Sequence, residues 1–292
     1  LHGALGQIGL LPDCLGAQAS GRTDTDRTTP GQGTARKGRQ LMSEPLVKMR
    51  GITKRFGGVT ALSNVDLDAY AGEVLAIVGD NGAGKSTLIK VLTGVYQPSS
   101  GEMMLDGKPV AFSNHAEAIE MGIDAVYQTL ALADHLDPAA NMFLGNELTT
   151  KFLGVTMLDN KRMRDETERV LMERLGVKLK SLDAPTESLS GGQRQAVAIA
   201  RAVYHEGLRV LVMDEPTAAL GPQETARTLK LIETVKAQGL CVILISHSLD
   251  DVFQVADRVH VQRRGQCVGV VKTADSNSTE VLGMIVGAEE AA

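Results

Sequence analysis

Hydrophobic residues follow two different patterns along this chain. Residues 46–56 (LVKMRGITKRF) and 64–70 (NVDLDAY) alternate apolar with polar positions, which is typical of antiparallel strands with one solvated face. Further along, four short runs are almost wholly apolar: 74–78, 123–127, 210–213 and 242–245. Such runs suit parallel strands that helices cover on both faces. The pattern therefore predicts an α/β fold, with a mostly parallel core sheet and an N-terminal antiparallel β subdomain.

Polar residues follow each of the four apolar runs. The first run leads into a glycine-rich loop, and the other three lead into Gln128, Asp214-Glu215 and Ser246-His247. In open α/β sheets, ligands bind outside the carboxyl ends of the strands. We therefore expect these side chains to meet at one edge of the sheet and to form the active site there.

The glycine-rich loop at 79–87, GDNGAGKST, fits the pattern G-x-x-x-x-G-K-[ST] between a strand and the helical run STLIKVL. Glycines let backbone N–H groups wrap around phosphates, because Cβ atoms would obstruct them. We expect a nucleoside triphosphate to be held by Asn81, Gly82, Ala83, Gly84, Lys85, Ser86 and Thr87. Lys85 would place its charge at the β- and γ-phosphates, and the Ser86 hydroxyl would ligate Mg²⁺. The alternative is an ordinary glycine turn into a helix.

Acidic and polar residues at the other strand ends complete a hydrolytic site. Asp214 can hold the Mg²⁺ shell, while Glu215 can orient an attacking water and partly deprotonate it. His247 is predicted to contact the γ-phosphate and to position the transition state. Gln128 can reach Mg²⁺ or the water as a neutral amide. The alternatives are a solvated acidic pair, a structural histidine and a surface glutamine.

A second glycine-rich stretch, LSGGQ at 189–193, precedes a predicted amphipathic helix whose apolar stripe is Ala196, Ile199, Ala200 and Val203. The helix dipole and free N–H groups make this N-terminus a second anion site, formed by Ser190, Gly191, Gly192 and Gln193. Since the first loop already holds the chain's own nucleotide, we expect the second site to close on the nucleotide of another copy. The alternative is a plain glycine cap.

Composition narrows the function further. The chain has 292 residues and a formal net charge of −5 without a long basic run, which argues against nucleic acid as a partner. Its three cysteines fit neither a metal spacing nor a disulfide framework and indicate a reducing compartment. No apolar run approaches the ~20 residues that span a bilayer. Residues 1–42 show no period and are expected to be a disordered leader without a signal peptide, followed by one domain over 43–292.

The motifs GDNGAGKST, Gln128, LSGGQ, VLVMDEP and His247 occur in the order found in the ATP-binding cassette (ABC) ATPases, which this chain resembles over about 46–287. The resemblance implies a P-loop fold with an inserted α-helical subdomain at about 130–195. It also implies a dimer that sandwiches two ATP molecules and drives an attached membrane permease. An adenine-stacking aromatic is implied at Phe56, where a core phenylalanine is the alternative.

One stretch and one single residue extend the resemblance to a narrower group within the family. Residues 124–147 are similar to bacterial monosaccharide importers of the ribose, xylose and fructose type, and Gly221 stands where the family usually has an aspartate. This implies two copies of the chain, two permease subunits and a periplasmic sugar-binding protein, at the cytoplasmic face of the inner membrane. The sugar would be recognised by the other chains. The alternatives are a transporter for another substrate and a non-transport cassette, although 88–188 lacks the sustained heptads of chromosome-type ATPases.

Apolar side chains are frequent just after Gln128, where the family receives a helix of the permease. We expect part of the set to be exposed as a docking groove, with Phe143 as its anchor. The set is Leu130, Leu132, Leu136, Met142, Phe143 and Leu144. The alternative is that all of these side chains pack inside the helical subdomain.

Overall fold

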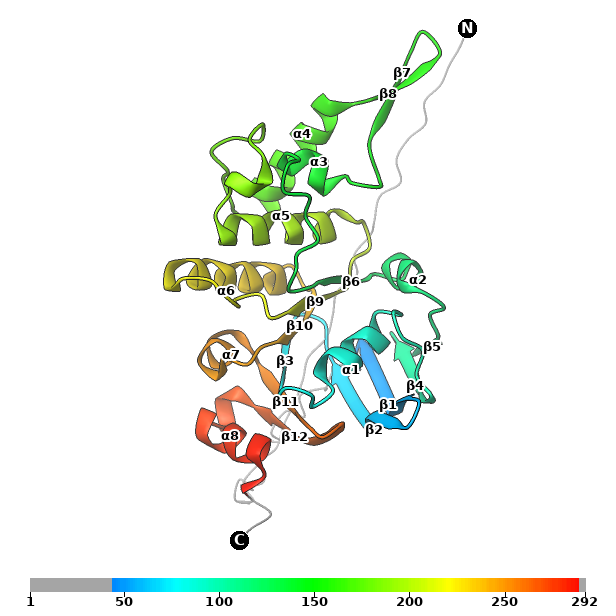
Figure 1. Ribbon diagram of the computed structural model, residues 1–292, viewed down its shortest axis with the longest axis vertical. Helices are drawn as coiled ribbons and strands as arrows, with labels where there is room; N and C mark the ends of the chain where they lie inside the picture. Colours follow the sequence, from blue (N-terminus) through cyan, green and yellow to red (C-terminus); the bar gives the residue numbers. More distant parts are fainter. Residues whose placement is uncertain (1–43, 289–292) are drawn as a thin grey trace, which may run out of the picture. The chain divides into compact units, whose positions relative to one another are not determined.

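A six-stranded sheet forms the centre of the computed structural model, which describes residues 44–288 (Figure 1). The strand order is β12–β11–β3–β10–β9–β6, and all neighbours are parallel except β12, which pairs antiparallel with β11. The strands are β3 Val74–Val78, β6 Ile123–Val126, β9 Val210–Asp214, β10 Cys241–Ile245, β11 Arg258–Arg263 and β12 Gln266–Lys272. All four apolar runs lie in this sheet as parallel strands, so that prediction is confirmed. The predicted leader at 1–42 lies outside the described residues.

A second sheet is antiparallel, as the alternating N-terminal pattern predicted. Its order is β2–β1–β4–β5, and the strands are β1 Val47–Phe56, β2 Val59–Ala69, β4 Ser100–Leu105 and β5 Lys108–Val110. The β1–β2 turn is tighter than expected, since β2 begins directly after Gly57-Gly58. On β1, Val47, Met49 and Ile52 are fully buried, whereas the end of the strand at Phe56 reaches solvent.

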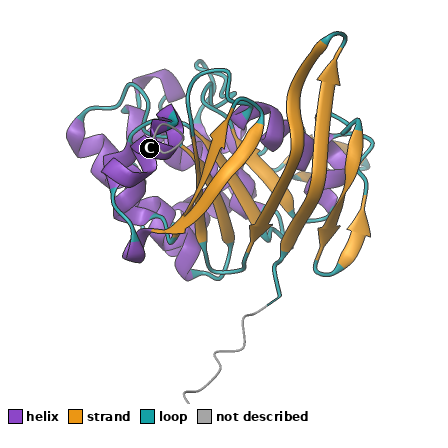
Figure 2. Cartoon of the chain, turned by 90° about the horizontal axis from the view of Figure 1, so that it is seen from below, coloured by secondary structure: helices purple, strands orange, loops and turns teal. Residues whose placement is uncertain are grey.

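The two faces of the core sheet bury their side chains in different clusters. Leu75 and Ile77 of β3 pack with helix α1, Lys85–Leu92, and with the antiparallel sheet. Val74, Ala76 and Val78 point to the other face, where α5, α6, α7 and α8 pack. In Figure 2 most of the helices gather on one side, while the antiparallel strands lie on the other. A strand covered on both faces is shielded from water at nearly every position. Apolar side chains are therefore favoured throughout it, which explains the continuous apolar runs.

A helical layer formed by α3, α4 and α5 lies between β6 and β9 in the chain. Here α3 is Pro138–Met142, α4 is Asn160–Arg169 and α5 is Gly191–Tyr204. Helix α4 passes directly into a π turn at Val170–Arg174. The amphipathic α5 is confirmed, since its predicted apolar stripe is fully buried. The remaining helices are α2 His115–Glu120, α6 Pro222–Ala237, α7 Leu249–Val255 and α8 Ser278–Val286, with 3-10 turns at Thr186–Ser188 and Thr273–Asp275.

Two features of the helical layer differ from the predictions. Sequence reasoning missed a two-stranded hairpin, β7 Thr149–Phe152 with β8 Val155–Leu158. The choice of Phe143 as an exposed docking anchor was wrong, because its side chain is fully buried against Tyr204, with ring centroids 4.7 Å apart in a T-shaped arrangement. Its neighbour Leu144 is 48% exposed instead. Between residues 44 and 288, no helix is long and apolar enough to cross a membrane.

Candidate functional site

The loop between β3 and α1 requires glycine at two positions for reasons of space and backbone conformation. Gly79 has φ +150°, and a Cβ there would collide with the carbonyl oxygen of Gln262. Gly84, which precedes α1, has φ +103°, and a Cβ there would lie 2.8 Å from the Ala61 oxygen. Residues with a side chain rarely adopt such φ values. The loop is therefore held tightly from beneath, while Asn81 and Gly82 stay exposed on its open side.

The Lys85 ammonium lies in the curl of this loop. Its Nζ donates hydrogen bonds to the carbonyl oxygens of Gly79 at 2.7 Å and Asp80 at 3.1 Å. Burial lowers the pKa of Lys85, and the charges of Glu215, Asp214 and Asp80 oppose that shift. The exits of β3 and β9 thus converge closely enough for their charges to interact.

Asp214 and Glu215 lie at the end of β9. Asp214 pairs with Ile245 of β10, and the Glu215 N–H donates to the Ile245 oxygen at 2.9 Å. Glu215 has φ +50°, an uncommon backbone conformation for a residue with a side chain, which sets the direction of its carboxylate. Burial raises the pKa of Asp214, the Glu215 charge raises it further, and Lys85 lowers it.

The donor atoms near Asp214 suit a hard cation. Two neighbouring carboxylates, Asp214 and Glu215, add negative charge at this strand end. The available ligands are oxygens: the Asp214 carboxylate, the Ser86 hydroxyl at the exposed start of α1, and the exposed Gln128 amide beyond β6. Mg²⁺ prefers such oxygens together with those of phosphate. The described residues contain no cluster of three or more His, Cys, Asp or Glu side chains that could hold a metal without the nucleotide.

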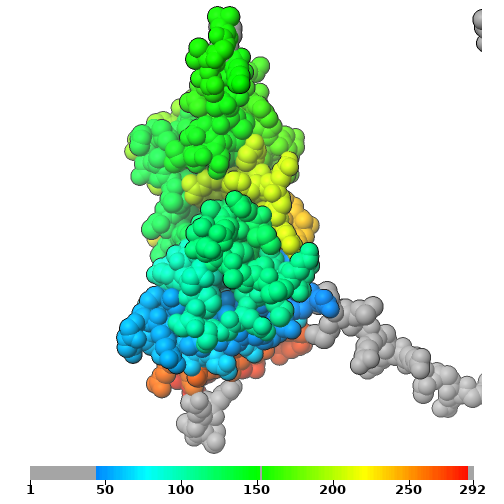
Figure 3. Space-filling view, turned by 90° about the vertical axis from the view of Figure 1, so that its right-hand side faces the viewer, coloured from blue at the N-terminus to red at the C-terminus, as the bar shows by residue number. Residues whose placement is uncertain are grey.

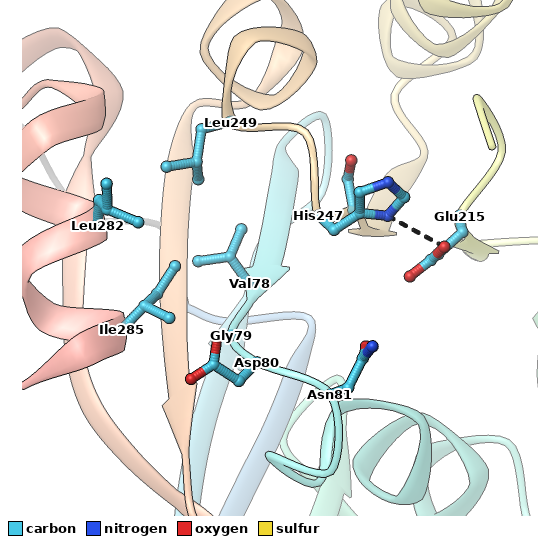
Figure 4. Close-up of a pocket in the computed structure, with 10 residues that line it drawn as sticks. Val78, Gly79, Asp80, Asn81, Glu215, His247, Leu249, Leu282 and Ile285 are labelled. Carbon is cyan, nitrogen blue, oxygen red and sulfur yellow. Dashed lines mark hydrogen bonds and ion pairs between the residues drawn. The ribbon is translucent and has the colours of Figure 1, made fainter.

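His247 approaches Glu215 from the neighbouring strand exit (Figure 4). Its Nδ1 lies 3.1 Å from Glu215 Oε2. Ser246 Oγ accepts the Ser248 N–H, and Ser248 caps α7 by accepting the Asp251 N–H. These bonds fix the segment that carries His247. A pocket of about 400 Å³ lies beside the pair, lined on one side by Gly79, Asp80 and Asn81 and on the other by Leu249, Leu282 and Ile285.

The structure places Gln128 at the same sheet edge as the acidic pair. β6 pairs with β9 up to Val126 and Met213, so Gln128 lies two residues past the last pair and Asp214 lies one residue past it. Gln128 is exposed. The four predicted exits therefore do meet at one edge.

The LSGGQ segment forms the N-terminus of α5, as predicted. Ser190 is the N-cap residue, and its N–H donates to Gln193 Oε1 at 3.0 Å. A Cβ on Gly191 would lie 2.5 Å from Leu220 Cδ2, so the Leu220 side chain would have to move, whereas a Cβ on Gly192 would meet only ordinary contacts at 3.7 Å or more. None of these residues lines the pocket beside Glu215. Within one chain, the structure does not bring the two glycine-rich sites together.

Phe56 is not a core phenylalanine, since 43% of its surface is exposed at the end of β1. Its ring packs edge-on against Tyr96 with centroids 5.2 Å apart, and Lys54 Nζ lies 5.0 Å from the ring centroid. An exposed aromatic ring held in this way can stack on a planar base. Sequence reasoning missed both Tyr96 and Lys54, because no local pattern links them to Phe56.

The support beneath the phosphate loop was also missed. The Gly265 N–H in the β11–β12 turn donates to the Ala83 oxygen at 2.9 Å. Gln262 of β11 is buried; its Oε1 lies 2.9 Å from His260 Nε2, and its Nε2 has no hydrogen-bond partner. These residues follow the loop by about 180 positions, so only the folded chain reveals their role.

Three comparisons with known proteins are informative. The profile of a family described as ABC transporter matches residues 62–218. The fructose import ATP-binding protein FrcA of Rhizobium meliloti is 44% identical over 253 residues, which cover 86% of this chain and 97% of that protein. The ribose import ATP-binding protein RbsA of Clostridium tetani is 42% identical over 86% of this chain but only 49% of its own length. The chain thus spans about half of the ribose protein.

The fold also matches an experimental structure. A dimer of the ATP-binding cassette MJ0796, in a post-hydrolysis state with ADP and phosphate, aligns with a TM-score of 0.64 at 25% identity. The alignment covers 78% of this chain and 98% of that one. Sequence and structure therefore agree on the same family.

Proposed function

Because this chain belongs to the ABC transporter family of ATP-binding proteins, we propose that it is the ATP-hydrolysing subunit of a bacterial monosaccharide importer. The observation that carries the hydrolytic part is the Glu215–His247 pair beside the phosphate loop, with Lys85 and Asp214 close by. The proposal that the transported solute is a monosaccharide rests on the similarity to the fructose import protein over nearly its whole length.

The proposed roles follow from the chemistry of each group. Glu215 orients the attacking water and takes its proton, while His247, held by the same carboxylate, contacts the γ-phosphate. Lys85 exchanges its hydrogen bonds to the loop carbonyls for bonds to the β- and γ-phosphates. Phe56 stacks on the adenine. The charge that develops on the phosphate oxygens during hydrolysis would then be stabilised by groups that are already in position before the reaction.

Magnesium is proposed as the metal because the oxygen donors and the two neighbouring carboxylates suit it. Asp214, Ser86 and Gln128 would hold it, together with the phosphates. When bound, the ion would neutralise charge on the phosphates. A cation near Asp214 would also offset the burial that raises the pKa of that carboxyl.

The second glycine-rich site supports a dimer in which each chain serves the other's nucleotide. The N-terminus of α5 carries donors and a positive dipole end, yet it lines no part of the pocket beside Glu215 in its own chain. Two copies arranged head to tail would bring Ser190, Gly191 and Gly192 onto the partner's γ-phosphate. The related cassette MJ0796 is a dimer in its post-hydrolysis structure.

We propose that the dimer lies at the cytoplasmic face of the inner membrane and binds two permease subunits. A periplasmic sugar-binding protein would deliver the sugar to these subunits. Residues of about 130–195 are the proposed helical subdomain, which would contact the permease. The usual aspartate is replaced by Gly221, which caps α6 with an ordinary φ of −71° and open space around its Cβ position. The fold would accept the aspartate, so the glycine is not a steric requirement.

Sugar uptake in a strain that lacks this gene tests the proposal. Cells would be grown on a panel of monosaccharides with labelled uptake measured for each, with complementation by the wild-type chain and by Glu215→Gln. We expect loss of uptake for one sugar or a small group, rescued only by the wild type. Unchanged uptake of every monosaccharide, with loss of transport of another solute, would favour a different substrate. Unchanged transport of all solutes would point to a non-transport cassette.

A further inference from the structure

The turn that follows strand β9 is strained at two positions. Glu215 has φ +50° and Ala219 has φ +61°, a left-handed conformation that residues other than glycine rarely adopt. We call residues 215–220 the glutamate turn. Inside it, the Ala218 N–H donates to the Glu215 oxygen at 3.1 Å. A strained backbone of this kind persists only where the surrounding structure holds it in place.

A side-chain hydrogen bond holds the middle of the glutamate turn. Thr217 Oγ1 donates to Asp251 Oδ2 of α7 at 2.8 Å. Asp251 is itself fixed, because its N–H donates to Ser248 Oγ at 3.3 Å and the Ser248 N–H donates to Ser246 Oγ at 3.1 Å. The Asp251 carboxylate therefore links the glutamate turn to the segment that carries His247.

The exits of β9 and β10 are thus joined by two different side-chain contacts. One is the contact of His247 with Glu215, which faces the pocket beside Glu215 (Figure 4). The other is the Thr217–Asp251 bond, and neither of its residues lines that pocket. In the proposed function His247 and Glu215 both act on the nucleotide or the water. Thr217 and Asp251 have no such task, so their bond can serve only to position the turn.

Packing covers only part of the glutamate turn. Pro216 is buried, but Thr217 and Asp251 are partly exposed. A cavity of about 460 Å³ lies beside the turn, and its lining includes Thr217, Ala219, His247 and Asp251. A segment that borders open space has few contacts to restrict its motion. The hydrogen bond to Asp251 is therefore a restraint that packing does not duplicate on this side.

We propose that Asp251 is a positioning residue for ATP hydrolysis. Its carboxylate acts through Thr217 to hold the glutamate turn, so that Glu215 points at the attacking water while His247 stays beside it. Asp251 does not touch the nucleotide and transfers no proton. The inference rests on the proposed function for the role of Glu215. It adds a residue on which the rate of hydrolysis depends but the binding of ATP does not.

Steady-state ATP hydrolysis by the purified full-length chain tests this role. Asp251→Ala removes the carboxylate but keeps the N–H that Ser248 accepts. Thr217→Val removes the hydroxyl and nearly preserves the shape of the side chain. We expect each variant to lower kcat roughly ten- to a hundredfold, the effect of losing one hydrogen bond to a charged group. The KM for ATP should stay within about twofold of the wild-type value, because the bond does not contribute to ATP binding.

Conservative variants and a double variant distinguish loss of this bond from general damage. Thr217→Ser keeps a hydroxyl donor and Asp251→Asn keeps a carbonyl acceptor, so each should retain kcat within about threefold of the wild type. The double variant Thr217→Val with Asp251→Ala should be no slower than either single variant, because the same bond is lost in each. Melting temperatures of all variants report on folding in parallel.

Two exposed residues provide matched controls. Asp250 lies beside Asp251 in the first turn of α7, and its carboxylate makes no hydrogen bond within the described residues. Asp250→Ala therefore removes the same charge without removing the bond. Thr156→Val removes a threonine hydroxyl from β8, in the green tip at the top of Figure 3. Both controls should hydrolyse ATP like the wild type.

Three results would overturn the proposal. The first is that Asp251→Ala and Thr217→Val hydrolyse ATP as fast as the controls, and the second is that their effects multiply in the double variant. The third is a lower melting temperature with unchanged kcat, which would assign the bond to stability alone. Glu215→Gln in the same assay separates this inference from the proposed function. Wild-type activity in Glu215→Gln would overturn both, whereas a slow Glu215→Gln beside unaffected Asp251 variants would overturn this inference alone.

Discussion

Replacing Phe143 with alanine tests how the helical layer is held together. Phe143 ends α3 and is fully buried, with its ring edge-on to Tyr204 of α5 at 4.7 Å. Removing a buried phenylalanine costs about 3–5 kcal/mol, of which the aromatic pair accounts for roughly 0.5–1.5 kcal/mol. In a domain of this size each kcal/mol lowers the melting temperature by about 2–4 °C. We therefore expect a fall of roughly 10 °C for Phe143→Ala.

The adjacent residue supplies the control. Leu144 is 48% exposed, so Leu144→Ala should change the free energy of unfolding by only about 0.5 kcal/mol. Both variants would be followed by circular dichroism during thermal and urea denaturation of the nucleotide-free chain. If Phe143→Ala melts together with Leu144→Ala and the wild type, the packing of α3 on α5 does not stabilise this layer. A selective loss of permease assembly would then return Phe143 to the docking role that its burial argues against.

Three further predictions concern the nucleotide site. Dimers mixed from Lys85→Ala and Gly192→Asp chains should recover some ATPase activity that neither homodimer has, because one of their two shared sites is free of both changes. The shared-site arrangement would be refuted if these dimers stay inactive while dimers of the double mutant with the wild type are active. Gly192→Ala should leave the melting temperature unchanged or slightly raised, because its Cβ meets only ordinary contacts, and yet reduce ATPase activity. Gly191→Ala should displace the Leu220 side chain and lower the melting temperature by no more than a few degrees. Asp214→Asn should stabilise the nucleotide-free chain at neutral pH. The folded-state pKa of Asp214 is raised, so its contribution to stability is present below the unfolded value of 3.8 and is lost as pH rises through the folded value. The gain from Asp214→Asn should therefore shrink on acidification, and a gain that is constant with pH would contradict the cause given for the shift.

Features set by local chemistry could be predicted from the sequence. The apolar runs identified four of the five parallel strands, because burial on both faces leaves few polar positions in them. The fifth, β11, alternates apolar with polar residues and was missed, although it pairs parallel with β3. The spacing of residues in the phosphate loop and the apolar stripe on α5 each depend only on residues close together in the sequence. The convergence of the strand exits followed from the geometry of parallel sheets.

Features that depend on distant contacts could not be predicted in this way. Phe143 and Leu144 are adjacent apolar residues, and only the position of Tyr204 decides which of them is buried. The support of the phosphate loop by Gln262 comes from a strand far along the chain. The β7–β8 hairpin was missed because its turn holds Leu153 where a type I′ turn favours asparagine.

ATP turnover by Glu215→Gln is the measurement that most directly tests the hydrolytic site. Glu215 is held 3.1 Å from His247 beside the phosphate loop, and its replacement removes the general base while preserving size and shape. Turnover should fall roughly 10²–10⁴-fold, equivalent to about 3–5 kcal/mol of barrier. ATP binding should persist, and the trapped nucleotide should stabilise a dimer detectable by light scattering. ATPase activity close to that of the wild type, with no ATP-dependent dimer, would contradict both the catalytic role of Glu215 and the shared site.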